Sequence, residues 1–547
     1  MALNRQIKVP MPEHGIIRRQ TGRPDVYKVT KTFRKDGKPD NKRKCIGQYD
    51  IKSGMLIPNN AYYEFFGQPD DFVVKPPDKE AAQYEVSPLA YEHSITAPGV
   101  IWLVTRILQD LRVADILNAV FGASMAEQII LVASYMVSRG NVMEYTSDWC
   151  DVHVLDGFIS SQSTSWLFSK LTFSGRMAFF KGWAGLRAQA EYIAYDVTSF
   201  SSYAQGIPDL ERGYNRDKEK LPQINMALYL GQISRLPVFY LTYQGSIVDK
   251  SHLRYMMAFN DELGIQNVSF VLDCGFCSTA NLEYMRENHY TFIVAVEIRH
   301  KTTKLAIDKV SAQIGSMEYL IAGNVRGVAV KDVYYRVDST MHVYFDGERK
   351  VLEDASLKRT ADSAAAELQQ FIDGKTALDS KQRKKYEKYF DVEYTGNTPA
   401  SLKYNYSKID EMAKYNGFFC LLSNDSLTSA QILETYRRKD SIEKGFDEIK
   451  NFIDMKRLRT HYADTTDGKL FCAFVALIAA MHMQDKLGKL MTENSLTKDK
   501  IVLELEKMQV VQFGENKRQY APLSKLQKSI ISEFGFTEND YSEFLMH

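Results

Sequence analysis

The stretch that indicates the fold is YIAYDVTSF, residues 192–200, a run rich in β-branched and aromatic residues. Similar apolar runs follow it along the chain: INMALYL (224–230), LPVFYLTY (236–243), VSFVLD (268–273) and FIVAVEI (292–298). Glycine and proline punctuate several of these runs, and text with helical character from 282 to 288 precedes the last one. Strands followed by helices predict a central mixed sheet in an α/β fold.

The regions on either side of these runs have a different character. Residues 96–190 show helical periodicity, whereas residues 300–415 are more polar, with short strands and a charged helical stretch from 357 to 389. We interpret the polar region as an insertion. The apolar pattern resumes at GFFCLLSN (417–424), and Thr428 with Gln431 three residues later predicts a capping box for the next helix.

Length and composition predict a cytoplasmic protein of several domains. A chain of 547 residues is too long for one core and suggests about three or four domains. Six cysteines are too few for a disulfide scaffold and indicate a reducing compartment. The N-terminus lacks the apolar core of a signal peptide, and the longest apolar run, Leu470 to Met481, is shorter than the ~20 residues that span a bilayer. We expect that run to be a buried core helix and expect no membrane partner.

The N-terminal fifty residues are basic although the whole chain has a net charge of only +1. They hold 13 Lys or Arg against 5 Asp or Glu, with a dense cluster at Lys42, Arg43 and Lys44. Residues 27–57 alternate as strands do around the turn dipeptide Asp36-Gly37, which predicts a small basic β-unit suited to DNA. A solvated basic terminus is the alternative interpretation.

The segment YRRKDSIEKGFDEIK, residues 436–450, combines a polar and an apolar pattern. Tyr436, Glu443 and Lys450 are seven residues apart, so on an α-helix they share one face with ~20° of drift per heptad. Apolar residues in a 4-3-4 spacing would bury the adjoining stripe: Ile442, Phe446, Ile449 and Ile453. A phenol, a carboxylate and an ammonium beside a buried stripe suit a site that handles phosphate.

Three carboxylates are placed to bind metal. Asp196 and Asp273 each end an apolar strand, and Glu443 stands on a later helix, which together make the oxygen-rich cluster that Mg²⁺ requires. Two Mg²⁺ ions ~4 Å apart can activate a water or a 3′-hydroxyl and stabilise the leaving oxygen of a phosphodiester. Alone, each Asp reads as a turn or cap residue and Glu443 as a solvated charge, so the prediction rests on the three together.

These residues resemble a known family. The segment 436–450 is similar to the YREK signature of bacterial insertion-sequence DDE transposases, Tyr-x2-Arg-x3-Glu-x6-Lys, with Tyr436, Glu443 and Lys450 at the matching positions. YDVTSF around Asp196 and VLDCGFCS around Asp273 resemble the segments of the family's two catalytic aspartates. LRTHYADTTDGKLFCAFVALI (458–478) is similar to the family's C-terminal continuation.

The resemblance implies an RNase H-like core in which Asp196, Asp273 and Glu443 bind two divalent ions, Mg²⁺ or Mn²⁺. It also implies that the signature's Tyr, Arg and Lys contact DNA phosphates beside the cleaved end. Here the Arg position is Lys439, which keeps the charge but loses the planar fork of a guanidinium. Arg438 points about 100° away on a helix and could compensate. The expected phosphate contacts are therefore Tyr436, Arg438, Lys439 and Lys450.

The resulting domain prediction divides the chain into seven segments around an RNase H-like core with a largely β insertion. They are a basic DNA-binding unit (1–66), a linker (67–92), a helical DNA-binding region (93–190), the first part of the core (191–300), the insertion (301–416), the second part of the core (417–455) and a C-terminal helical region (456–547).

The function implied is a DNA transposase. It would bind terminal inverted repeats, cleave the element's ends, and join the 3′-hydroxyl ends to target DNA, as a homodimer because two ends must be held together. Two alternatives stay open: an RNase H-like nuclease without strand transfer, and a domesticated DNA-binding protein that has lost its chemistry. The three retained carboxylates count against the second alternative.

A few other residues invite a chemical interpretation. Cys274 and Cys277 form a CxxC, but with no second such pair we expect two buried thiols rather than zinc ligands. His461 could lie near the carboxylates, although a core or surface histidine is the simpler interpretation. All four Trp residues precede Asp196, so any aromatic platform for a DNA base in the insertion must be Tyr or Phe. The candidates are Tyr334, Tyr335 and Tyr344.

Overall fold

The computed structural model describes residues 7–13, 16–20, 23–35, 38–50, 52–67, 93–187, 191–265, 268–513 and 517–546. Two compact units divide the chain, Met1–His93 and Ser94–His547. The predicted Asp36-Gly37 turn and the predicted linker, from residue 68 onward, lie outside the described residues.

The first unit is a small antiparallel sheet followed by a helix. Its core is formed by Val9, Val26, Ile46 and Leu56. The helix begins after Asn59, whose side chain accepts a hydrogen bond from the Tyr62 N–H and so caps the first turn. The elements are β1 (Ile16–Gln20), β2 (Arg23–Lys35), β3 (Lys38–Asp50), β4 (Met55–Pro58) and α1 (Asn60–Phe66), with the strands in the order β1-β2-β3-β4.

The second unit is built on a mixed sheet in which five strands at one end have the RNase H-like order. β6, β7 and β8 form an antiparallel meander, and β9 and β10 then lie parallel to β6 on its other side. Every residue of β7 is buried, so the sheet is covered on both faces. The bounds are β6 (Tyr192–Ser201), β7 (Gln223–Gly231), β8 (Pro237–Gln244), β9 (Ser269–Leu272) and β10 (Thr291–Val296).

The insertion continues this sheet instead of standing apart from it. β16 pairs antiparallel with β10, and β13, β12 and β11 follow outward, which extends the sheet to nine strands. The segment expected to be largely β also contains the 27-residue helix α12, and a separate small core around Leu368 and Phe390. The elements are α11 (Lys301–Val310), β11 (Leu320–Ala322), β12 (Val325–Tyr334), β13 (Val337–Asp346), α12 (Gly347–Asp373), α13 (Ser380–Tyr386), β14 (Phe390–Thr395), β15 (Thr398–Tyr404), α14 (Tyr406–Ala413) and β16 (Phe418–Ser423).

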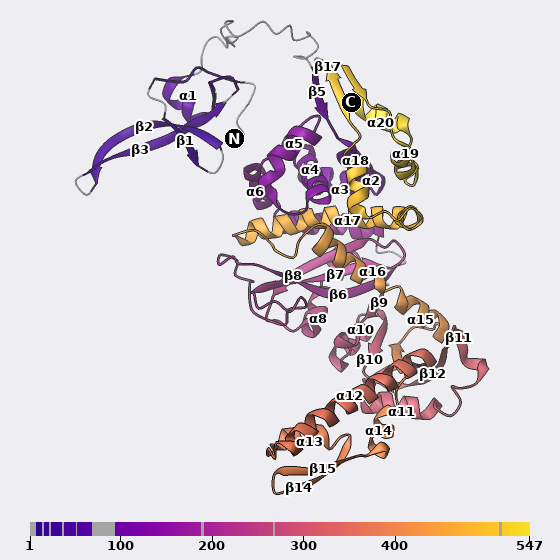
Figure 1. Cartoon of the computed structure of the whole chain (residues 1–547). Helices are drawn as coiled ribbons and strands as arrows, with labels where there is room; N and C mark the ends of the chain where they lie inside the picture. The colour runs from indigo at the N-terminus through magenta and orange to yellow at the C-terminus, as the bar shows by residue number, and fades with distance from the viewer. Residues whose placement is uncertain are drawn as a thin grey trace. The chain divides into compact units, whose positions relative to one another are not determined.

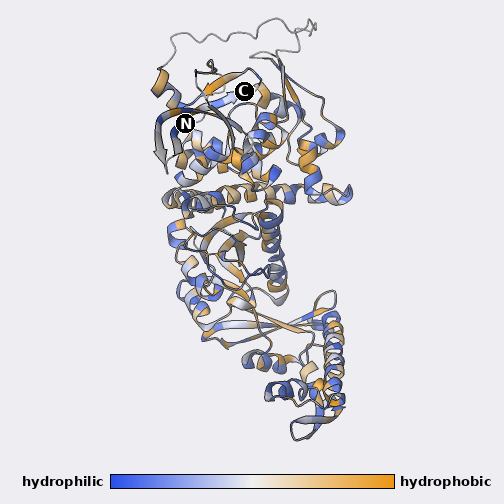
Figure 2. Cartoon of the chain, turned by 60° about the vertical axis from the view of Figure 1, so that its left-hand side comes forward, coloured by the Kyte–Doolittle hydropathy of each residue, from blue (hydrophilic) through white to orange (hydrophobic). Residues whose placement is uncertain are grey.

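One long helix joins the sheet to the helical region. α17 (Ala463–Glu493) lies between the sheet and the helices α2–α6 in Figure 1 and contacts α2, α4, α6 and β8. Figure 2 shows hydrophobic residues gathered where these helices and the sheet meet. The helices are α2 (Gly99–Asp110), α3 (Val113–Phe121), α4 (Ala123–Arg139), α5 (Thr146–His153), α6 (Ser161–Lys170) and α7 (Phe173–Arg187).

The predicted core helix at Leu470–Met481 is confirmed as part of α17, and each of its residues is buried. Among the described residues α17 is the helix long and apolar enough to cross a membrane, but most of that apolar stretch is packed inside the protein. The chain ends in α18 (Lys498–Leu505), β17 (Val510–Phe513), β18 (Lys517–Tyr520), α19 (Lys525–Ser532) and α20 (Glu538–Met546), and β17 and β18 form a small sheet with β5 (His93–Thr96).

Candidate functional site

The two aspartates are neighbours on parallel strands, but only Asp273 follows the end of its strand; the prediction that Asp196 also ends a strand is wrong, because β6 continues to Ser201. Tyr195 of β6 is paired in register with Leu272 of β9, so the next residues, Asp196 and Asp273, are adjacent at the edge where β9 ends. The Val197 N–H donates to Asp196 Oδ1 at 2.8 Å. The two carboxylates form a polar site at the carboxyl end of β9.

The environment of Asp196 favours its neutral form. The pKa of the Asp196 carboxyl is raised to about 6, chiefly by burial and less by the charge of Asp273, against the opposing effects of Lys439, the Val197 N–H and Arg216. A buried carboxylate beside a second carboxylate is costly without a cation. The pair is therefore a place where a positive charge is stabilising.

Both oxygens of Asp273 are held by residues of the 436–450 segment. The Tyr436 hydroxyl donates to Oδ1 at 3.0 Å, and the Lys439 ammonium lies 2.8 Å from Oδ2. The Lys439 side chain is only 5% exposed. Burial, and then the charge of Asp273, raise the pKa of the Tyr436 phenol, which keeps it a hydrogen-bond donor. Lys439 thus supplies an internal cation to both aspartates, where the sequence predicted a contact to DNA phosphate.

Residues 436–450 do not form the single α-helix that the heptad spacing predicted. α15 (Ser429–Arg437) ends before α16 (Asp440–Asp447) begins, and a π-helical turn, η5 (Glu448–Phe452), follows. The Gln232 amide bridges the break by donating to the Thr435 carbonyl (3.1 Å) and accepting from the Lys439 N–H (3.2 Å). Lys439 nevertheless stays on the side of Tyr436, as residues three apart on a helix do, and both contact Asp273.

Two features of this segment follow the prediction. The capping box at the start of α15 is present, with the Thr428 hydroxyl accepting from the Gln431 N–H. The apolar stripe is buried: Ile442, Ile449 and Ile453 lie in the core, and Phe446 packs against it. Burial of this stripe holds α16 against the sheet, where it contacts β6.

Glu443 stands on the exposed side of α16. Its charge is one of the causes that raise the pKa of the Tyr436 phenol. Within the described ranges no three His, Cys, Asp or Glu side chains are arranged as a ready-made metal cluster. A positive charge, the Lys439 ammonium, already lies beside Asp196 and Asp273. The carboxylate oxygens of the two aspartates therefore fit a hard divalent cation.

Lys450 contacts a carboxylate away from this pair. Its ammonium lies 2.7 Å from Asp217 Oδ2, and its side chain is 9% exposed. Asp217 belongs to the loop between β6 and β7, so the ion pair anchors that loop on η5. The predicted phosphate contact of Lys450 remains a prediction.

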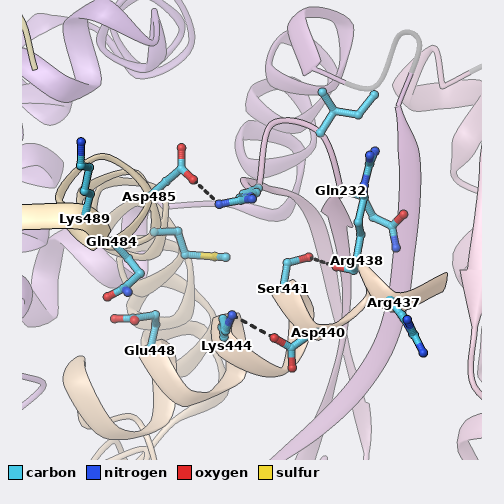
Figure 3. Close-up of a pocket in the computed structure, with 14 residues that line it drawn as sticks. Gln232, Arg437, Arg438, Asp440, Ser441, Lys444, Glu448, Gln484, Asp485 and Lys489 are labelled. Atoms are coloured by element: carbon cyan, nitrogen blue, oxygen red, sulfur yellow. Dashed lines mark hydrogen bonds and ion pairs between the residues drawn. The ribbon is translucent and has the colours of Figure 1, made fainter. Parts of the chain in front are cut away.

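Arg438 faces a different cavity, shown in Figure 3, of about 630 Å³ between the β7–β8 turn, α16 and α17. Arg438 forms an ion pair with Glu434 at 2.6 Å, and Lys444 on the same side pairs with Asp440 at 2.9 Å. The consecutive residues 438 and 439 thus point to different sides of the segment, in keeping with the predicted ~100° between neighbours. Arg438 does not take the place of Lys439 at the aspartates.

The predicted basic cluster lies on a two-stranded ribbon of the first unit. Lys42 and Lys44 are exposed on β3. Cross-strand register places Lys42 opposite Lys31 and Lys44 opposite Lys28 of β2. Arg43 is half-buried between the two lysines, and Lys44 also pairs with Glu64. Lys28 and Lys31 were not singled out from the sequence, although two basic strands joined by a turn dipeptide were a signal for them.

The tyrosine, cysteine and histidine candidates differ in how far they are exposed. Tyr344 and Tyr334 are buried in the sheet and Tyr335 is half-buried, so Tyr334 and Tyr344 cannot serve as platforms for a DNA base. Cys277 is buried as expected, but Cys274 is exposed, and neither belongs to a metal cluster in the described part of the chain. His461 is an exposed residue of a loop.

Comparison with known proteins agrees with this geometry. Residues 188–479 match the family described as Transposase DDE domain, and the chain belongs to that family. No curated protein matches the chain. Among solved structures, the chain is similar to a piggyBac transposase in a synaptic complex with hairpin DNA, at 9% identity, with 82% of this chain and 80% of that chain covered and a TM-score of 0.36. The family assignment rests on the domain match.

Proposed function

We propose that this chain is a transposase that binds the terminal inverted repeats of its element, cleaves the DNA strands at the ends, and joins the 3′-hydroxyl ends to target DNA. The proposal rests chiefly on the adjacent pair Asp196 and Asp273 of an RNase H-like sheet. The buried Lys439 ammonium already lies beside this pair, 2.8 Å from Asp273. The family match over residues 188–479 supports the proposal.

Asp196 and Asp273 would hold the divalent ions, Mg²⁺ or Mn²⁺, with Glu443 completing the set from α16. Bound ions would supply activation of the attacking water or 3′-hydroxyl and stabilisation of the leaving oxygen. Glu443 is exposed on α16, and among the described residues no hydrogen bond or ion pair holds its side chain. The aspartates are adjacent on parallel strands and need no rearrangement.

Tyr436 and Lys439 would have two successive roles. In the metal-free chain they satisfy both oxygens of Asp273. Neutralisation of Asp273 by a bound cation would free the phenol and the ammonium, which then lie beside the reacting phosphate. Lys439 binds a phosphate as a point charge, whereas an arginine would do so through two parallel hydrogen bonds. Arg438 and Lys450 would contribute to DNA binding from outside the metal site.

The lysine ribbon of the first unit supports DNA binding. Lys28 faces Lys44, and Lys31 faces Lys42, so two pairs of like charges lie directly opposite each other. Such pairs destabilise an antiparallel ladder, and a polyanion relieves the repulsion. We propose this ribbon, with Arg43, as a surface for the DNA backbone of the terminal repeats.

The assembly would be a homodimer acting in the cytoplasm of a bacterium on double-stranded DNA, because two element ends have to be joined in one event. The domain boundaries predicted from the sequence are proposed on the same basis. A chain that cleaves DNA but never joins it would instead be a nuclease.

The test is a Mg²⁺-dependent assay on a supercoiled plasmid that carries the two ends flanking the gene. Nicked or linear product together with DNA joined to a second plasmid supports the proposal. Cleavage without joined product would favour the nuclease, and DNA binding without cleavage would favour a binding protein that has lost its chemistry.

A further inference from the structure

A second pocket, of about 640 Å³, opens at the far end of β6, away from the cavity of Figure 3. Its walls are the loop 202–206 that follows β6 and the loop 457–462 that precedes α17. Its lining includes the aromatic and basic side chains of Tyr203, Arg457, Arg459, His461 and Tyr462. None of them belongs to the carboxylate site or to the 436–450 segment.

The two loops that form this pocket are tied together. The Ser201 N–H donates to the Lys456 carbonyl and the Leu458 N–H to the Ser201 carbonyl, each at 3.2 Å, as in a short parallel ladder. At Gly206 any Cβ would lie 2.7 Å from the His461 carbonyl oxygen, so the close approach of the loops requires glycine. The walls are therefore held at a defined separation.

The floor of the pocket is pinned from within the core. The buried Lys469 ammonium of α17 donates to the Leu458 carbonyl at 3.0 Å and to the Asn141 carbonyl at 2.8 Å. The Asn141 amide in turn donates to the carbonyls of Asp454 (2.6 Å) and Arg457 (2.8 Å). A loop whose carbonyls are satisfied by buried donors is preorganised, which lowers the entropy cost of binding a ligand.

Two large aromatic side chains of this pocket remain outside the core. Tyr203 is 76% exposed and Tyr462 is 66% exposed. Single exposed apolar residues are common, but two exposed rings in one pocket offer a surface on which a planar group can stack. The Arg457 guanidinium lies 5.7 Å from the centre of the Tyr203 ring. Its two terminal nitrogens donate to the Glu219 carboxylate at 2.6 and 2.7 Å, which holds the guanidinium beside the ring.

Cationic and titratable groups accompany the rings. Arg459 is about half-exposed and pairs with Asp454 at 3.1 Å, and His461 is exposed. Aromatic rings flanked by arginine and histidine are the chemistry that binds an unpaired nucleotide, since bases stack on the rings and phosphates meet the cations.

The pocket and the carboxylate site are joined by the second half of β6. β6 continues for five residues from Asp196 to Ser201, a rise of ~17 Å at ~3.4 Å per residue. The same distance corresponds to about five nucleotides along one strand of duplex DNA. A strand whose phosphate lies at Asp196 and which follows the direction of β6 would reach Tyr203.

We infer that this pocket binds an unpaired nucleotide of a DNA strand that passes through the carboxylate site. Its base stacks on Tyr203 and Tyr462, and its phosphate contacts Arg459 and His461. The inference rests on the proposed DNA function and adds a binding site some five nucleotides from the reacting phosphate.

The experiment measures binding of the full chain to a fluorescein-labelled duplex with a five-nucleotide oligo-dT overhang, and to the same duplex fully paired. Tyr203→Ala with Tyr462→Ala should weaken binding of the overhang duplex by about 5- to 100-fold and leave the paired duplex unchanged. Tyr203→Phe with Tyr462→Phe, which keeps both rings, should restore the preference. 2-Aminopurine in the overhang should be quenched by the native chain but not by the alanine variant.

Tyr406→Ala is the matched control, because Tyr406 is 61% exposed on α14, away from the pocket. The inference is overturned if the alanine variant prefers the overhang as the native chain does, or if the phenylalanine variant loses as much affinity. It is also overturned if light scattering shows that the alanine variant changes only the oligomeric state, since the rings would then contact a second copy of the chain.

Failure of this inference and failure of the proposed function give different results. If the chain cleaves and joins DNA with Mg²⁺ but the tyrosine variants bind the overhang normally, the proposed transposase function stands and the nucleotide pocket is wrong. Overhang binding that depends on the tyrosines in a chain that never cleaves DNA would leave the pocket and remove the transposase.

Discussion

Like charges lie side by side both in the lysine ribbon of the first unit and in the aspartate pair of the second, but only the aspartates have a buried counter-charge beside them. In the ribbon, Lys28 and Lys44 lie directly opposite each other, with one glutamate, Glu64, paired to Lys44. In the carboxylate site, Asp196 and Asp273 are also neighbours, but the chain places the buried ammonium of Lys439 beside them. Exposed like charges are screened by water and salt, whereas the half-buried aspartates are screened less and are partly neutralised by the buried Lys439.

The difference indicates how each surface receives its partner. The ribbon needs no rearrangement to meet a polyanion, so binding there depends chiefly on the release of counterions. The aspartates must exchange an internal cation for an external one, so binding there is a competition.

The largest effect is expected from Asp273→Asn. The substitution keeps the size of the side chain but removes a charge that two donors hold. Metal-assisted stabilisation is worth several kcal/mol, so the cleavage rate should fall by about a thousandfold or more while DNA binding persists. The measurement is the rate of Mg²⁺-dependent strand cleavage beside a binding titration.

Asp332→Asn is the control, because Asp332 is an exposed insertion residue paired only with Lys309 and its own backbone. It should cleave at the native rate. If the Asp273→Asn chain still cleaves DNA, Asp273 is not a metal ligand, and the aspartate pair does not exchange Lys439 for a metal ion.

The next effect is expected from replacing the ribbon's four lysines, Lys28, Lys31, Lys42 and Lys44, with glutamine. Loss of up to four phosphate contacts should lower DNA affinity by about a hundredfold at low salt and reduce the slope of log affinity against log salt by about three to four. Because two repulsive pairs disappear, thermal stability should not fall. Fluorescence anisotropy at several salt concentrations measures both quantities.

The matched control replaces Lys358 and Lys385, exposed lysines of the insertion that each pair with an acid. That variant should keep the native salt slope. Equal slopes in the ribbon variant and the native chain would place DNA binding elsewhere.

Lys469 provides a third case, a buried cation whose hydrogen-bond acceptors are carbonyl and amide oxygens rather than carboxylates. Burial lowers the pKa of its ammonium to about 7. Between pH 7 and the usual pKa near 10.5, the unfolded chain binds more protons than the folded one, so stability rises with pH across that window. Relative to Lys469→Met, the native chain should gain about 2 kcal/mol between pH 7 and pH 9.

Urea unfolding at the two pH values measures this difference, and Lys489→Met, at a residue that is 82% exposed, should follow the native pH profile. Parallel profiles for the native chain and Lys469→Met would show that the ammonium keeps an ordinary pKa in the folded protein.

The smallest effect is expected from Lys439→Gln, which removes the internal competitor for the aspartates. Binding of Mn²⁺ in the absence of DNA should become about tenfold tighter, because two neighbouring carboxylates then lack a cation. Isothermal calorimetry measures the affinity. Lys444→Gln, which changes an exposed neighbour paired with Asp440, should leave it unchanged. Weaker Mn²⁺ binding in Lys439→Gln would mean that Lys439 holds the aspartates in position and does not compete for them.

The sequence was a good guide wherever local pattern decides the outcome. Apolar runs predicted the strands β6 to β10, and Asp273 follows β9 as predicted, whereas Asp196 lies within β6 and does not end it. The parallel register of β6 and β9 still makes the two aspartates neighbours. The Thr428 capping box and the buried stripe at Ile442 were likewise readable, because both depend on residues within one or two turns.

Long-range contacts were not readable in the same way. Heptad spacing predicted one helix with Lys450 on the same face as Glu443, but the helix breaks between α15 and α16 and changes to a π-helical turn. The break is stabilised by Gln232, some two hundred residues earlier in the chain, so no local pattern could indicate it. The partners of Lys28 and Lys31 depend on strand register, including a bulge near Val29.

The α/β class and the transposase family were readable from the sequence alone, and the domain match confirms the family, while the metal-binding role of the two aspartates stays a prediction. Only the tertiary structure decided that Lys439 turns inward to Asp273, that Arg438 turns outward, and that Lys450 pairs with Asp217. The physical reason is that periodicity records which residues are buried, whereas the choice of partner for a buried charge depends on segments brought together by the fold.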